Sequence, residues 1–206
     1  RNLISGNDQY GINLWADAHH NDTVGNLIGT DVEGTDRLGN GEAGVFLWQG
    51  AHHNRIGGTA AGEANVVSGN GYDWPGGPGV YVYSGAEHNQ LLGNLIGIDA
   101  TGTSPLPNGG DGVLVKTGSE PELLGPQENK IGPLNSIAFN GSHGIAVEGE
   151  PAIRNTITRN SVHDNEREGI RLAEGGNNEL PAPTVSEVDL DAGTVRGTTC
   201  AGCIVE

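Results

Sequence analysis

The chain is poor in basic residues, in long apolar runs and in sulfur, and each shortage excludes a class of protein. Its 10 Lys and Arg stand against 26 Asp and Glu, and the net charge of −16 argues against binding to a nucleic-acid backbone. No apolar run approaches the roughly 18 residues of a membrane-spanning helix, so we expect no membrane span in this chain. Methionine is absent and no signal peptide is recognisable, so we expect a piece of a longer protein.

Glycine, in contrast, is abundant, and one glycine-led strand pattern occurs six times. The 36 glycines show no collagen-like triplet period and gather with Asn and Asp where turns are expected. The six copies are GINLW (11–15), GVFLW (44–48), GVYVY (79–83), GVLVK (112–116), GIAVE (144–148) and GIRLA (169–173). Their second and fourth positions are aliphatic, so a period of two predicts that these face a core while the third and fifth face outward.

Two further strand signals accompany each glycine strand. The first begins with Asn at residues 2, 26, 65, 94, 135 and 160, and the third with Asn at 21, 54, 89, 129 and 155, with Asn178 expected to open the sixth. Three short strands in each coil and no helical period predict an all-β, right-handed, single-stranded parallel β-helix, a solenoid of about six coils with three short parallel sheets. We assign residues 1–180 to it.

The excess length of the longer coils is predicted to lie in loops. Residues 30–44 and 98–112 resemble each other at an offset of 68 residues, which indicates duplication of a pair of coils. Asp31 and Asp99 occupy the place that Asn7, Asn70, Asn140 and Asn165 have in other coils, so we expect them to cap turns.

The strings NxIxGN, IGxDxxGT and NxIGG, interleaved with the glycine strands, resemble the β-helix repeats of the pectate-lyase-like superfamily. The likeness covers roughly residues 2–180 and is greatest to repeat regions of large secreted or surface-anchored bacterial proteins. It implies an extracellular or cell-surface location and Asn ladders, in which each side-chain amide bonds to the next coil about 4.8 Å away.

Residues 181–206 depart from the repeat and are predicted to form a C-terminal extension. After a Pro-rich break they contain strand-like runs at 184–190, 194–198 and 204–206. The segment resembles the first strands of an immunoglobulin-like module but is too short to close a sandwich, so we expect a cap on the last coil or poor order. Cys200 and Cys203 lack the context of a redox or zinc motif, which favours a local disulfide or two thiols.

Outward positions of the first three glycine strands are predicted to form an aromatic face. The five candidate ligand-binding residues are Trp15, Phe46, Trp48, Tyr81 and Tyr83. Aromatic rings in a row suit the apolar faces of sugars, and the polar tips can bond hydroxyl groups. The alternatives are that an insertion loop covers the patch, that the rings stiffen the sheet by stacking, or that they contact a protein.

Two groups of residues are candidate metal ligands. Stacking predicts one column of His20, His53 and His88 beside another of His19, His52 and Glu87, a set suited to a transition metal. The alternative is a solvated turn, because the next coils carry Gln127-Glu128 and Ile153-Arg154 there. Asp36, Glu42 and Asp111 are candidate Ca²⁺ ligands, although no EF-hand spacing is present. These patterns require no cofactor, and Ca²⁺ is the candidate cofactor.

Three functions follow as hypotheses. The first is a non-enzymatic secreted or surface module that presents the aromatic face to a glycan or a protein. The second is a polysaccharide lyase or glycoside hydrolase with acids from the long loops, although Ser142-His143-Gly144 matches the Gly-His-Gly of polygalacturonases poorly. The third is a structural stalk or filament module that associates with other copies through the ends of the helix.

Overall fold

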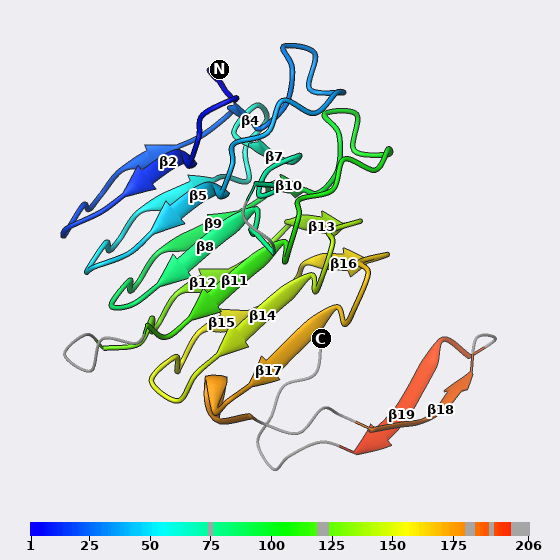
Figure 1. Cartoon of the computed structure of the whole chain (residues 1–206). Coiled ribbons are helices and arrows are strands. Elements are labelled where there is room, and N and C mark those ends of the chain that lie inside the picture. Colours follow the sequence, from blue (N-terminus) through cyan, green and yellow to red (C-terminus); the bar gives the residue numbers. More distant parts are fainter. Residues whose placement is uncertain (74–75, 119–123, 180–183, 190–191, 199–206) are drawn as a thin grey trace.

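The structure is a computed structural model that describes residues 1–73, 76–118, 124–179, 184–189 and 192–198. Within these ranges the chain is a right-handed parallel β-helix of three parallel sheets, as predicted (Figure 1). Cys200, Cys203 and the strand predicted at 204–206 lie outside the described residues. None of the helical segments in the described ranges has the length and apolar character to cross a membrane.

The first two sheets collect one strand from each of the six coils, and the third collects one from each of the first five. The first contains β1 (Leu3–Ile4), β4 (Leu27–Ile28), β7 (Val66–Val67), β10 (Leu95–Ile96), β13 (Ser136–Ala138) and β16 (Ser161–His163). The second, which we call the glycine-strand sheet, contains β2 (Tyr10–Leu14), β5 (Ala43–Leu47), β8 (Val80–Tyr83), β11 (Val113–Lys116), β14 (Ile145–Glu148) and β17 (Ile170–Ala173). The third contains β3 (Asp22–Thr23), β6 (Arg55–Gly57), β9 (Gln90–Leu92), β12 (Lys130–Ile131) and β15 (Thr156–Ile157).

The core consists of aliphatic columns that run along the helix axis. In the glycine-strand sheet, Val45 aligns with Ile12 on one side and with Val80 on the other. Ile28, Val67 and the other inward residues of the middle coils have no exposed surface. Ile170, in the last coil, retains 50% of its surface, because no further coil packs against it. The predicted inward positions are therefore confirmed.

The glycine that opens each strand of the glycine-strand sheet is required by close packing. A Cβ on Gly44 would lie 2.6 Å from Cγ1 of Val67 and 2.8 Å from the carbonyl oxygen of Gly79. Real Cβ atoms do not approach neighbours this closely, so any side chain there would push the first sheet away from the second. Glycine thus permits the tight corner between two sheets.

Three Asn ladders, each of six residues joined by five rungs, line the corners of the helix. They are Asn2, Asn26, Asn65, Asn94, Asn135 and Asn160; Asn7, Asn40, Asn70, Asn108, Asn140 and Asn165; and Asn21, Asn54, Asn89, Asn129, Asn155 and Asn177. In a typical rung, Oδ1 of Asn94 accepts from the backbone N–H of Asn65 at 3.3 Å and from its Nδ2 at 2.9 Å. These bonds satisfy buried backbone groups that no strand pairing reaches.

Two expectations about the ladders were wrong. Asn40 and Asn108, not Asp31 and Asp99, occupy the ladder position in the two long loops. The third ladder ends at Asn177, not Asn178, inside a short 3-10 helix (Gly176–Glu179) that stands where a sixth third-sheet strand was expected.

The two aspartates cap the turns of the duplicated loops, as predicted. Oδ1 of Asp31 accepts from the backbone N–H groups of Thr35 and Asp36, and these bonds hold the pKa of Asp31 below its usual range. Oδ1 of Asp99 accepts in the same way from residues 103 and 104, at the same offset of 68. The loops also touch each other, since the N–H of Ala100 donates to the carbonyl of Gly34 at 2.8 Å. Their shared geometry supports the predicted duplication of a pair of coils.

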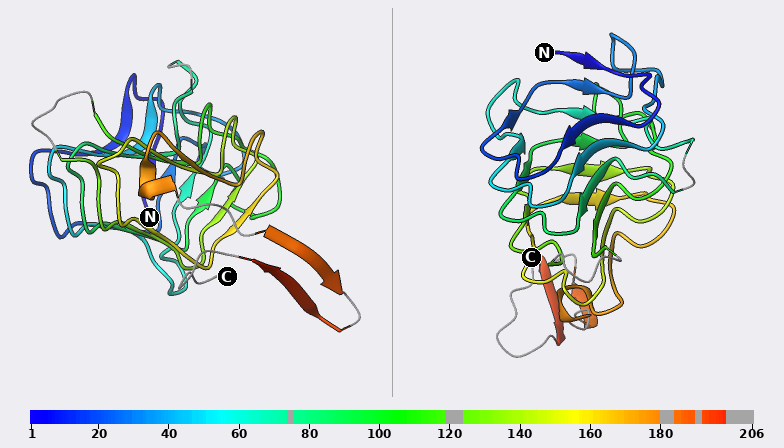
Figure 2. Two further views of the ribbon diagram at one scale, coloured as in Figure 1. Left: turned by 90° about the horizontal axis from the view of Figure 1, so that it is seen from below. Right: turned by 60° about the vertical axis from the view of Figure 1, so that its left-hand side comes forward.

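The C-terminal segment forms an antiparallel hairpin of β18 (Thr184–Asp189) and β19 (Thr194–Thr198). The two strand-like runs are therefore confirmed. Figure 2 shows the hairpin extending away from the coils, but residues 180–183 and 199–206 lie outside the described residues, so the expected cap or poor order of the whole segment stays a prediction. The 3-10 helix packs on the coils: the backbone N–H of Asn177 donates to the carbonyl of Ala152 at 2.7 Å.

We predict that Asn94→Ala destabilises the fold by about 3 kcal/mol or more, because it leaves several buried groups without partners. Asn94 accepts two bonds from Asn65 and donates to the carbonyl of Ile56. The matched control is Asn2→Ala at the exposed end of the same ladder, where only the bond from Nδ2 of Asn2 to Oδ1 of Asn26 is lost and the backbone bond is kept. Thermal or urea unfolding measures both, and equal losses in the two variants would contradict a cooperative ladder.

Candidate functional site

The outward surface of the glycine-strand sheet carries the predicted aromatic residues. The register places Asn13, Phe46 and Tyr81 in one column, with Leu114 following on the fourth coil. The aromatic patch, as we define it, consists of Tyr10, Trp15, Phe46, Trp48, Tyr81 and Tyr83. The predicted columns are therefore confirmed, and Tyr10 joins them.

The rings of the patch cover one another to different degrees. Phe46 lies 4.7 to 5.3 Å from the rings of Tyr10, Tyr81 and Trp48 and retains only 4% of its surface. Tyr81 retains 8%, whereas Trp15 retains 54%. Phe46 and Tyr81 therefore support the patch from below, and its accessible surface comes from Trp15, Trp48 and Tyr83.

The two indoles are held in place by hydrogen bonds at their polar edges. Trp15 stacks on Trp48 with 5.9 Å between ring centroids and 19° between planes. Nε1 of Trp48 donates to Oδ1 of Asn13 at 3.0 Å, and Nε1 of Trp15 donates to Oε1 of Gln49. Rings fixed in this way lose little conformational entropy when a ligand stacks on them.

A second group of side chains on this sheet was missed by the sequence analysis. It occupies the position immediately before each glycine, which holds Asp111, His143 and Glu168 in the last three coils. Nδ1 of His143 lies 2.8 Å from Oδ1 of Asp111, and Nε2 lies 2.9 Å from Oε2 of Glu168. The imidazole side chain is only 4% exposed, whereas that of Glu168 is 66% exposed. We call these three residues the acid–histidine cluster.

Charges around the acid–histidine cluster come from the neighbouring outward columns. The backbone N–H of Glu168 lowers the pKa of its carboxyl group, and the neighbouring His143 and Arg171 lower it further. Lys116 pairs with Glu148 at 2.9 Å, which raises the pKa of the lysine. A buried imidazole between two carboxylates can hold a proton or pass it to an exposed acid.

The sequence contained one signal of this cluster. The residue before the glycine is ionisable in three successive coils, but it is Tyr10, Ala43 and Pro78 in the first three, so the position looked variable. Strict alternation along the strand also predicted that this position faces inward. The bend at the glycine turns it outward.

The histidine columns form as predicted. His53 lies between His20 and His88, with ring centroids 5.3 and 4.9 Å apart. His19 stacks on His52 at 4.9 Å. The group whose metal-binding atoms converge is a different one, however: one donor atom each from Asp17, His19 and His52 lies within 4.8 Å of the others.

The three acids considered for Ca²⁺ lie in separate surroundings. Glu42 lies beside Gln9 and Tyr10, while Asp111 bonds to His143. Asp36 contributes its backbone to the turn capped by Asp31. Any Ca²⁺ site would thus need one of these acids with backbone carbonyls of its own loop, and such binding stays a prediction.

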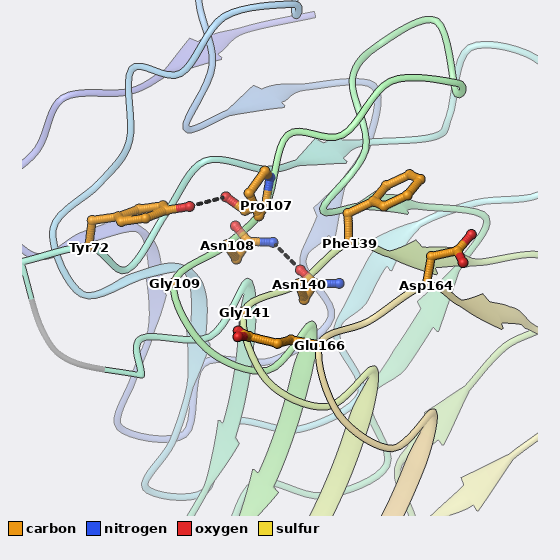
Figure 3. A pocket seen from close by; sticks show the side chains of 9 residues that line it. All are labelled: Tyr72, Pro107, Asn108, Gly109, Phe139, Asn140, Gly141, Asp164 and Glu166. Carbon is orange, nitrogen blue, oxygen red and sulfur yellow. Dashed lines mark hydrogen bonds between the residues drawn. The ribbon is translucent and has the colours of Figure 1, made fainter.

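A hollow of about 440 Å³ lies on another side of the molecule, above the second Asn ladder. Figure 3 shows Tyr72 and Phe139 on opposite sides of it, with Asn108 and Asn140 between them. Asp164 and Glu166 line it as well. No pattern in the sequence indicates this hollow, because its two rings, Tyr72 and Phe139, come from segments 67 residues apart.

Comparison with known proteins gave no relative: no family model, no curated protein and no solved structure matches this chain.

We predict that Tyr10 stabilises the fold at neutral pH and loses this effect in alkali. Burial and the neighbouring Glu42 raise its pKa from 10.0 to about 12. A raised pKa means that the folded chain keeps the proton longer than the unfolded chain, so the contribution is complete below pH 10 and is lost as pH rises towards 12. Denaturant unfolding between these pH values should show a steeper loss for the wild type than for Tyr10→Phe. Tyr72→Phe, outside the patch, is the control and should follow the wild type.

Proposed function

We propose that the chain is a non-enzymatic module of a secreted or cell-surface protein that binds a glycan through the aromatic patch. The observation that carries this proposal is the exposed stack of Trp15 on Trp48, with both indole N–H groups already bonded within the protein. Trp15 and Phe46 both stack on Trp48, but Trp15 keeps 54% of its own surface exposed, which leaves apolar area for the C–H faces of sugar rings. The repeat strings and the Asn ladders support kinship with the pectate-lyase-like superfamily, which is part of the same proposal.

The shape of the surface favours a polymer over a compact ligand. The patch lies on the outward face of a parallel sheet and spans the first three coils. Drug-sized ligands are usually buried in concave pockets, whereas a flat row of rings can contact several units of an extended chain. In the later coils the face continues with Lys116 and Arg171, both of which pair with Glu148.

We predict that Trp48→Ala weakens glycan binding about tenfold, the equivalent of one lost stacking interaction. Tryptophan fluorescence is the readout, because two of the three tryptophans lie in the patch. Titration uses a panel of neutral and uronic-acid polysaccharides. Tyr72→Ala, an exposed aromatic outside the patch, is the matched control and should bind as the wild type does. If no polysaccharide changes the fluorescence, the glycan proposal fails and a protein contact becomes the alternative.

A second candidate function is a polysaccharide-active enzyme, a lyase or a glycoside hydrolase. The acid–histidine cluster favours it, because a buried Asp111–His143 pair next to an exposed Glu168 lies on the same sheet as the aromatic patch. Asp111 comes from the end of the second long loop, where the acids of such an enzyme were expected. Acid–base work of this kind needs groups that can hold and release a proton beside the bound chain.

We predict for this second candidate that the wild type releases reducing ends or an unsaturated product from a polysaccharide. His143→Gln should abolish that activity, and Glu168→Gln, at an exposed position, should do so without affecting folding. His163→Gln is the control, since that exposed imidazole pairs only with Asp164 among the described residues at salt-bridge distance. Binding of the polysaccharide without any product would support the non-enzymatic proposal instead.

A further inference from the structure

The turn that follows the aromatic patch brings two imidazoles and a carboxylate to one point. Asp17 and His19 come from the turn between β2 and β3, and His52 comes from the same turn one coil later. Backbone pairing fixes all three: the N–H of Asp17 donates to the carbonyl of Gln49 at 3.1 Å, that of His52 donates to the carbonyl of Ala18 at 3.0 Å, and a parallel bridge pairs His19 with His52. The donors are therefore placed by the stacking of two coils.

The spacing of the donor atoms fits the edge of a metal coordination polyhedron. Zinc lies about 2.1 Å from a histidine nitrogen or a carboxylate oxygen, so two ligands of a tetrahedral ion are about 3.4 Å apart. Nε2 of His52 lies 3.1 Å from Oδ1 of Asp17. A donor atom of His19 lies within 4.8 Å of both. Small rotations of exposed side chains are enough to complete the set.

The neighbouring imidazoles orient the two ligand rings. Nδ1 of His52 lies 2.8 Å from Nδ1 of His53, and Nδ1 of His19 lies 2.9 Å from Nδ1 of His20. A hydrogen bond between two imidazole nitrogens uses Nδ1 of each ring, which leaves Nε2 of His19 and His52 for a metal ion. Second partners of this kind fix the ring tautomer in metal sites and raise affinity.

The surroundings of the site favour an added cation. Five imidazoles gather here over three coils, with neighbouring ring centroids 4.9 to 5.3 Å apart, and they are His19, His20, His52, His53 and His88. The chain as a whole has a net charge of −16, which attracts cations.

We propose that Asp17, His19 and His52 form a binding site for a divalent first-row transition-metal ion, with the remaining coordination positions open to water or a ligand. Nitrogen donors in a majority favour Zn²⁺, Cu²⁺ or Ni²⁺ over Ca²⁺ and Mg²⁺. The site does not depend on the proposed glycan binding, although it lies two residues beyond Trp15. His20 and His53, part of the column predicted from sequence, act as positioning residues for the ligand rings.

Calorimetry of the whole chain with Zn²⁺ alone tests the site. We expect one equivalent of tight binding that Ca²⁺ does not displace. His52→Gln and Asp17→Asn should each weaken it at least about tenfold, and His53→Gln should weaken it by a smaller factor. His163→Gln, which removes an exposed histidine elsewhere, should leave it unchanged. Cu²⁺ bound in place of Zn²⁺ should show two coordinating nitrogens by electron paramagnetic resonance.

Three results would overturn the proposal. One is weak binding of several equivalents that His52→Gln does not alter, which means an adventitious ion only. Another is binding lost equally in His163→Gln. The third is binding lost in His20→Gln or His88→Gln but kept in Asp17→Asn, which would place the ion on the other histidine column. Far-ultraviolet circular dichroism confirms that each variant keeps its β structure.

Discussion

The parallel register between successive coils is the constraint on which the rest of the structure depends. Each strand aligns residue for residue with the strand of the next coil, as Val113 aligns with Val80 and with Ile145. Because parallel strands lie about 4.8 Å apart, a residue type repeated at one position becomes a continuous stack of like side chains. Aliphatic stacks become the core, Asn stacks become ladders, and aromatic or imidazole stacks become surfaces with concentrated chemistry.

The periodic part of this arrangement could be predicted from the sequence, because it depends only on spacing. The six coils, the inward columns and the outward columns all follow from counting residues from the glycine. Counting failed where the chain makes an insertion. Asp31 stands three residues after Ile28, as Asn70 stands after Val67, but the inserted turn delays the ladder position to Asn40. The side chain that completes a ladder is chosen by three-dimensional position, which an insertion hides.

The degree of burial of the outward residues, and the side-chain direction of the residue before each glycine, could not be predicted. Spacing put Phe46 and Trp15 on the same face, yet one ring is nearly covered and the other is half exposed, since the cover depends on how neighbouring rings stack. The acid–histidine cluster was hidden for a geometric reason. A Cβ on Gly112 would point into the core and lie 2.6 Å from Cγ2 of Ile137. Gly112 therefore faces inward, as Val113 after it does, so the alternation breaks at this bend and Asp111 faces outward. Period-two reasoning assumes a straight strand and assigns that residue to the wrong side.

The Asn ladders have a further consequence, which concerns direction. In every rung the oxygen of one amide accepts from the asparagine of the preceding coil, and in the fully formed rungs its own Nδ2 donates to the following one. Three ladders oriented the same way make the two ends of the solenoid chemically unlike, one with amide oxygens and the other with amide hydrogens left over. A coil can therefore extend this helix only head to tail, and a reversed copy would set like groups against each other. The direction of the amides therefore gives the solenoid a structural polarity, and successive coils can be added in a single orientation only.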